Sequence, residues 1–197
     1  MPFVLPDPAG MAPEVYPLAW LVGTWRGEGV VDYPGIDEAP FVHEVVIDHD
    51  GGPYLSYTSS IRLVVAPDDA AVLVESGPVE PDPVWQAESG YWRIPPVRPT
   101  DHGLTDDQFP VELLIADPSG HVALYIGAVG KGRIDLVSDL IARAPSGAEV
   151  SAEKRLYGLV HGELMWAHDI AAFGHPMQSY ASGRLSRVEA PDEGTDS

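Results

Sequence analysis

The sequence contains no cysteine among its 197 residues. Disulfides, thiol nucleophiles and thiolate metal sites are therefore all excluded. A chain without cysteine suits a reducing compartment, and we expect a cytoplasmic protein. The sequence also lacks a charged start followed by an apolar run, and it lacks an apolar stretch long enough to cross a bilayer as a helix. We therefore expect no membrane association.

Positive charge is scarce. Lys and Arg number 11 against 30 Asp and Glu, which gives a net charge of -19 and a pI near 4.4. A surface of this kind repels phosphate groups, so we expect neither nucleic acid nor an anionic membrane as a partner. The simplest role of the negative charge is to keep the protein in solution.

Long helical patterns are also missing, and most of the chain consists of short apolar runs separated by turn-forming residues. Segments 41–48 and 54–65, joined by Asp50-Gly51-Gly52-Pro53, predict a β-hairpin. Clusters of Gly, Pro, Asp and Ser separate the later runs. Such regular spacing predicts an antiparallel meander that closes into a barrel, since closure removes exposed sheet edges. Beyond a first strand that begins at Gly23, the further strands are expected at 85–94, 110–116, 121–128, 132–142, 149–159, 163–172 and 179–188.

We expect a single domain over residues 14–189. Four prolines make residues 1–13 a flexible arm, and residues 190–197 form a polar acidic tail that we expect to be disordered. Residues 66–83 are expected to form an extended, partly ordered hairpin tip. A short helix is predicted over Glu14–Leu21, packing against the body through Tyr16, Leu18, Trp20 and Leu21.

The segment from Gly23 to Gly29 reads Gly-Thr-Trp-Arg-Gly-Glu-Gly. A period of two residues divides it into a polar face and an apolar face, so the apolar face is expected to point inward. Two inward glycines indicate a bend or space left for a ligand. We interpret this strand as the wall of a cavity, with an inward face made by Trp25, Gly27, Gly29, Val31 and Tyr33.

The motif formed by Gly23, Trp25, Gly27 and Gly29 resembles the signature of the nitrobindins, barrels related in shape to the fatty-acid-binding proteins. The resemblance extends over residues 15–188 and includes, in order, segments 52–57, 87–93, 111–114 with 118–120, 165–178 and 185–187. It implies a ten-stranded antiparallel β-barrel that holds haem b in a mostly apolar cavity. Members of this family bind nitric oxide and convert peroxynitrite to nitrate.

The resemblance fails at the residue that ligates iron. The family pattern is Gly-x-Pro-x-x-x-His, whereas Gly174 and Pro176 lead here to Tyr180, and Gly35 stands where the family commonly has threonine. In the first interpretation haem binding is lost, no cofactor or metal is held, and the barrel binds a small apolar or planar molecule. A barrel filled by its own side chains, with a purely structural role, is a further alternative.

Two other interpretations keep the haem and make the protein a peroxynitrite isomerase. In one, Tyr180 ligates ferric iron as a phenolate, as tyrosine does in catalase, with Arg184 helping to remove its proton. In the other, a histidine replaces the lost ligand. His168 is the first candidate because it alternates with apolar residues on one face of its strand, and His175 is the second.

Six residues are expected to line the cavity or its mouth: Trp25, Tyr33, Tyr57, Trp166, His168 and Tyr180. The alternation of the last strand predicts that the Tyr180 side chain points outward, because Ala181, Gly183 and Leu185 form the inward set. A bulge before the strand would turn it inward. Glu88 and Arg93 are expected to form an ion pair or to face solvent separately. An exposed barrel face also leaves a homodimer possible.

Overall fold

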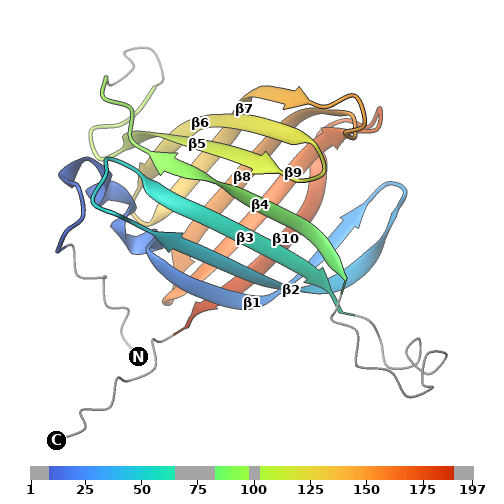
Figure 1. The fold of residues 1–197 in the computed structure, drawn as a ribbon, viewed down its shortest axis with the longest axis horizontal. Helices are drawn as coiled ribbons and strands as arrows, with labels where there is room; N and C mark the ends of the chain where they lie inside the picture. Colours follow the sequence, from blue (N-terminus) through green and yellow to red (C-terminus); the bar gives the residue numbers. More distant parts are fainter. Residues whose placement is uncertain (1–8, 65–82, 98–102, 189–197) are drawn as a thin grey trace, which may run out of the picture.

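Ten antiparallel strands close into a barrel in the computed structural model, which describes residues 9–64, 83–97 and 103–188 (Figure 1). Each strand pairs with its neighbours in sequence, and β1 pairs with β10 to close the ring. The up-and-down topology confirms the predicted fold class. The strands are β1 (Gly23–Tyr33), β2 (Ile36–Asp48), β3 (Leu55–Leu63), β4 (Val84–Arg93), β5 (Phe109–Asp117), β6 (His121–Gly130), β7 (Arg133–Arg143), β8 (Val150–Val160), β9 (Glu163–Ala172) and β10 (Gln178–Arg187).

The expected strands agree with the observed ones to within two residues at each end, except that β2 begins at Ile36, five residues before the expected start. The interpretation of residues 66–83 as a hairpin tip falls almost wholly outside the described residues, as do the tail at 190–197 and most of the arm at 1–13. Over the residues that are described, no helix has the length and apolar character needed to span a membrane.

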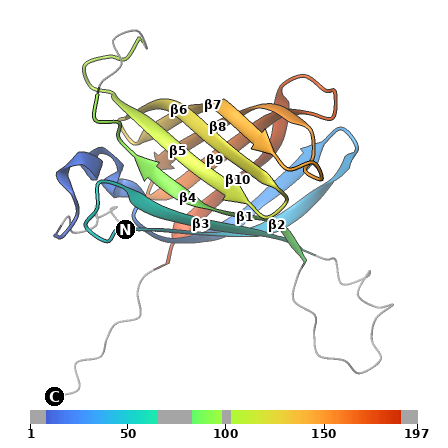
Figure 2. The same cartoon turned by 45° about the horizontal axis from the view of Figure 1, so that its top comes forward.

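A short 3-10 helix, η1 (Pro13–Leu21), covers one end of the barrel (Figures 1 and 2). With three residues per turn, Val15, Leu18 and Leu21 fall on one side, and all three are fully buried. Tyr16 lies off that side and is 49% exposed, so its predicted packing against the body was wrong. The helix thus closes the barrel end at which β1 begins.

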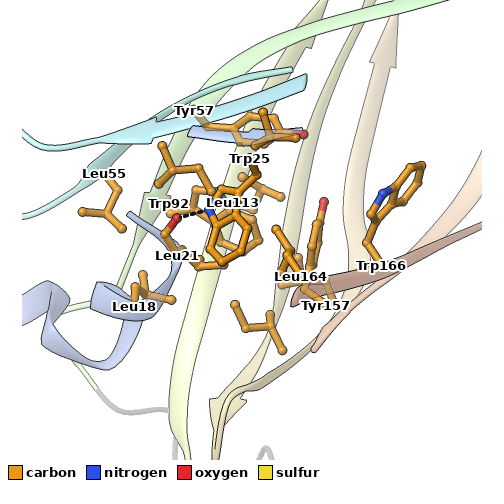
Figure 3. Packing of buried hydrophobic residues seen from close by; sticks show 14 of the residues in the cluster. Leu18, Leu21, Trp25, Leu55, Tyr57, Trp92, Leu113, Tyr157, Leu164 and Trp166 are labelled. Atoms are coloured by element: carbon orange, nitrogen blue, oxygen red, sulfur yellow. Dashed lines mark hydrogen bonds between the residues drawn. The ribbon is translucent and has the colours of Figure 1, made fainter. Parts of the chain in front are cut away.

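The half of the barrel nearest η1 is filled by large apolar side chains (Figure 3). Trp25 and Trp92 are both fully buried there, and the Trp25 indole N–H donates a 2.7 Å hydrogen bond to the carbonyl of Leu21. Burial of each large apolar side chain contributes about 1.5–3 kcal/mol. Packing in this half therefore contributes substantially to the stability of the barrel.

The glycines of β1 allow close packing and do not leave room for a ligand. A Cβ atom on Gly27 would lie 2.0 Å from the carbonyl oxygen of Arg184 in β10. On Gly29 it would lie 2.3 Å from the Ser182 carbonyl oxygen and 2.4 Å from the Phe41 ring. The inward face of the strand was correctly predicted, but its interpretation as a cavity wall was wrong, because β10 and Phe41 occupy the space.

A register shift between Ser179 and Ala181 interrupts the pairing of β10 with β9. Ser179 pairs with Asp169 and Ala181 with His168, which leaves Tyr180 without an opposite residue. This is the bulge that the inward orientation of Tyr180 required. Its side chain joins the inward set of the strand and lines the cavity described next.

Candidate functional site: a cavity with a buried polar network

A cavity of about 500 Å³ opens at the barrel end opposite η1. This volume lies within the usual range for small-molecule sites, about 300–1,000 Å³. Its wall includes the first residues of β4, β8 and β10. The start of β4 extends beyond the turn that joins β5 to β6. The apolar part of the wall includes Ile36, Val84, Ile115, Ala123, Val150, Ile170 and Phe173.

The inner boundary of the cavity is a network of buried polar side chains. Arg155 on β8 donates two hydrogen bonds to Glu88 on β4, of 2.9 Å from Nη1 and 2.6 Å from Nη2. Glu88 also accepts hydrogen bonds from Tyr57 (3.0 Å) and Gln86 (2.7 Å). Since β5, β6 and β7 lie between β4 and β8, the ion pair crosses the barrel interior. It separates the filled half from the open half.

Glu153 extends this network toward the mouth. Its Oε2 atom accepts a hydrogen bond from the Tyr125 hydroxyl and lies 3.0 Å from Nε2 of His168 on β9. The same oxygen lies 3.7 Å from Nη2 of Arg155. Glu88, Glu153, Arg155 and His168 are all less than a tenth exposed. Four ionisable side chains therefore meet beside one cavity.

The electrostatics of the network favour charged carboxylates. Burial opposes ionisation of Glu88, but the Arg155 guanidinium outweighs it and brings the pKa below its ordinary value. For Glu153, burial is likewise outweighed, here by the His168 hydrogen bond and by nearby positive charge, so its pKa is also lowered. Burial, reinforced by Arg155, lowers the pKa of His168 and favours its neutral form.

Across the mouth, Trp85 Nε1 on β4 donates a 2.7 Å hydrogen bond to the Tyr180 hydroxyl on β10. The Tyr180 ring also meets the rings of His168, at 5.6 Å between centroids, and Tyr33, at 6.1 Å. The bond joins two strands separated by β1, β2 and β3. Trp85 and Tyr180 thus partly close the opening from opposite sides.

Of the six residues predicted to line the cavity, His168 and Tyr180 do so. Tyr57 lies just below, as a donor to Glu88. Tyr33 is buried beside the mouth, where its hydroxyl accepts a 3.0 Å hydrogen bond from the Ala172 N–H. Trp166 packs against Phe41 and His43, outside the cavity wall. Trp25 belongs to the filled half, so its placement in the cavity was wrong.

Sequence reasoning missed most of the polar network. Glu88 and Arg93 do not pair: residues five apart on a strand face opposite sides, and Arg93 instead forms a 3.0 Å ion pair with Glu112. In β8 the alternation of inward and outward residues could have revealed part of the network. Glu153 and Arg155 share the inward face of that strand with Tyr157. Two charged residues at inward positions were the available indication of a polar site.

The cavity offers no iron ligand at the position that the resemblance assigns. The hydroxyl of Tyr180 accepts the Trp85 N–H, and burial, with the nearby carboxylates, raises its pKa, which opposes a phenolate. Arg184 gives no help, because its exposed side chain pairs with Glu163 at 3.5 Å. His175 is exposed and packs edge-on against the Tyr33 ring. Tyr180 therefore does not fit the role of a haem ligand.

Among the described residues that line the cavity, His168 carries a ring nitrogen, Nδ1, that could serve as a ligand instead. Its Nε2 is held by Glu153, and metal-ligating histidines commonly carry such a carboxylate on the other ring nitrogen. Its Nδ1 takes part in no hydrogen bond with the part of the chain that is described.

Comparison with known proteins gives a consistent result. Residues 14–187 match the family model described as THAP4-like, heme-binding beta-barrel domain. A ferric nitrobindin-like protein of Beutenbergia cavernae is 46% identical over 95% of this chain and 100% of its own length. A peroxynitrite isomerase of Clavibacter michiganensis is 36% identical over 92% of this chain and 98% of its own length.

The crystal structure of Rv2717c from M. tuberculosis superposes with a TM-score of 0.71 and 29% sequence identity. The match covers 91% of this chain and 99% of that one. Fold and sequence comparisons therefore agree over nearly the whole barrel.

Proposed function

The chain belongs to the nitrobindin family of haem-binding β-barrels, and from that premise we propose that it is a member that has lost iron ligation and carries a small organic molecule. Tyr180 occupies the place of the histidine that ligates iron in the family. The cavity beside it is large enough for a small ligand and combines an apolar wall with a polar inner boundary.

The observation that carries this proposal is that the Tyr180 hydroxyl is protonated and hydrogen-bonded to Trp85. A phenol ligates ferric iron as the phenolate, but burial and three carboxylates, those of Glu88, Asp117 and Glu153, raise the pKa of Tyr180. Its hydroxyl oxygen is already the acceptor of the Trp85 hydrogen bond. The residue is therefore a poor substitute for the neutral imidazole that haem proteins commonly use.

Titration of the purified chain with hemin tests the proposal. We expect no sharp Soret band at one equivalent of hemin, and only the broad absorption of loosely associated haem. A sharp, stoichiometric band that persists after gel filtration would contradict the loss of iron ligation. If no such band forms, native mass spectrometry of the chain as purified would show whether an organic molecule is retained in the cavity.

A second candidate is a haem protein that isomerises peroxynitrite with His168 on the iron. It is favoured by the Glu153–His168 pair, which resembles the carboxylate–histidine arrangement of metal sites. When bound, haem would supply the ferric centre at which peroxynitrite reacts. His168→Leu would then abolish the Soret band, whereas Tyr180→Phe would leave it; the opposite result would assign the iron to Tyr180.

A further inference from the structure

The cavity presents a free carboxylate oxygen. Both hydrogen bonds that Glu153 accepts through its side chain, from Tyr125 and His168, are made to Oε2. Its Oε1 accepts none from any described residue, and it is not among the buried polar atoms that are sealed from solvent. Glu153 is 8% exposed and lines the cavity. The accessible side of Oε1 is therefore the cavity itself.

A second free acceptor faces the cavity, on His168. An ionised carboxylate can only accept, so the Nε2 that lies 3.0 Å from Glu153 must carry the proton. In the neutral ring this makes Nδ1 an acceptor. That atom has no partner among the described residues and is not sealed from solvent. Two acceptors thus face the cavity without a donor.

The network carries a net negative charge, which favours a positively charged donor at these acceptors. Arg155 donates both terminal nitrogens to Glu88, so its charge is already matched by one carboxylate. Glu153 is a second carboxylate, and with neutral His168 the four groups carry a net charge of about −1. A buried, uncompensated charge is costly, so a cationic ligand would stabilise the site and a carboxylate would be repelled.

We propose that the cavity binds a primary organic ammonium with a planar apolar body. The ammonium group donates to Glu153 Oε1, and the body lies against Ile115, Ile170 and the Trp85–Tyr180 pair. This proposal rests on the carrier function proposed above and specifies its ligand class. The chain's net charge of -19 also attracts cations from solution, which favours fast encounter.

Three indole probes of equal ring size test the proposal by isothermal titration calorimetry: tryptamine, 3-methylindole and indole-3-propionate. We expect tryptamine to bind at least about tenfold more tightly than the acid, which corresponds to about 1.4 kcal/mol. In Glu153→Gln the free oxygen loses its charge, and the tryptamine preference should fall to less than about threefold. Glu112→Gln, which removes the half-buried carboxylate that pairs with Arg93 away from the cavity, should keep the full preference.

The comparison of probes on the unmodified protein does not depend on how well Glu153→Gln folds. Binding of the acid or of 3-methylindole as tightly as tryptamine would overturn the ammonium proposal, as would failure of all three probes to bind. A preference that Glu112→Gln lowers as much as Glu153→Gln would assign it to the general surface charge and would also overturn it. Only a stoichiometric Soret band in the hemin titration would overturn the carrier function itself.

Discussion

Glu88 and Arg155 meet in the middle of the barrel through two hydrogen bonds of 2.6 and 2.9 Å, although three strands separate them around the wall. Both side chains are almost fully buried. A buried pair of this kind contributes little net stability, because desolvation offsets attraction, but a single remaining partner is strongly destabilising.

Removal of one member should therefore cost more than removal of both. We expect Glu88→Gln to lower the free energy of unfolding by about 3–5 kcal/mol, and the double variant Glu88→Gln/Arg155→Met to recover a large part of that loss. Urea denaturation of both variants and of Arg155→Met completes the cycle. The half-buried pair of Arg93 and Glu112, on the outer face of the barrel, serves as the control, where either substitution should cost less than about 1 kcal/mol. Additive losses at Glu88 and Arg155 would show that the two groups are not coupled.

Restoring a histidine at the bulge should restore haem binding. In Tyr180→His an imidazole replaces the phenol at a position that lines the cavity, and neutral imidazole is a good iron ligand. We expect a sharp Soret band on addition of hemin and an affinity at least about tenfold higher than that of the parent chain. Ser179→His, one residue away with an exposed side chain, is the matched control and should show neither. If both variants behave alike, the effect comes from an added surface histidine.

His43 makes stability depend on pH. Its buried ring bonds to Ser59 through Nε2 at 2.8 Å, its Nδ1 has no partner among the described residues, and burial lowers its pKa to about 4. Because the unfolded chain takes up the proton near pH 6.5 and the folded chain does not, stability is full above pH 6.5 and falls toward pH 4. At pH 5 the loss from this group is about 2 kcal/mol. Denaturation at pH 7 and pH 5 should show a smaller pH-dependent difference in His43→Phe; an unchanged difference would contradict this role.

The close approach of β1 and β10 makes Gly27 hard to replace. A methyl group there would meet the backbone of Arg184, which cannot move without breaking the strand pairing. We expect Gly27→Ala to lower the free energy of unfolding by about 3 kcal/mol or more, at the upper end of overpacking effects. Gly158→Ala, in β8, has no atom within 4 Å of the added methyl and should change stability by less than about 1 kcal/mol. Melting temperatures of the two variants provide the comparison.

Alternation of apolar and polar residues, with turn residues between the runs, was enough to place nearly every strand of this barrel. The signal is strong because inward and outward sides differ in burial along most strands: in β9, Leu164, Trp166, His168 and Ile170 alternate and are all buried. Alternation says which face is inward, but it does not say what fills the inside. For that reason Trp25 was wrongly assigned to a cavity wall.

The site was predictable only where chemistry and parity were considered together. His168 was identified because a titratable residue stands among inward apolar ones, and the same reasoning applied to Glu153 and Arg155 would have found them. The Glu88–Arg155 pair was beyond reach, because its partners lie 67 residues apart and meet only through barrel closure. The orientation of Tyr180 depended on a bulge that parity alone cannot place.

The division of the barrel into a filled half and an open half has an evolutionary consequence. Large apolar side chains pack beneath η1, whereas a ligand in the cavity would meet residues at the opposite end. Substitutions around the mouth can therefore accumulate without unfolding the chain, and a lineage can change the lining of the cavity while keeping its scaffold. Replacement of the family's histidine by a tyrosine at position 180 is the kind of step that such a separation permits.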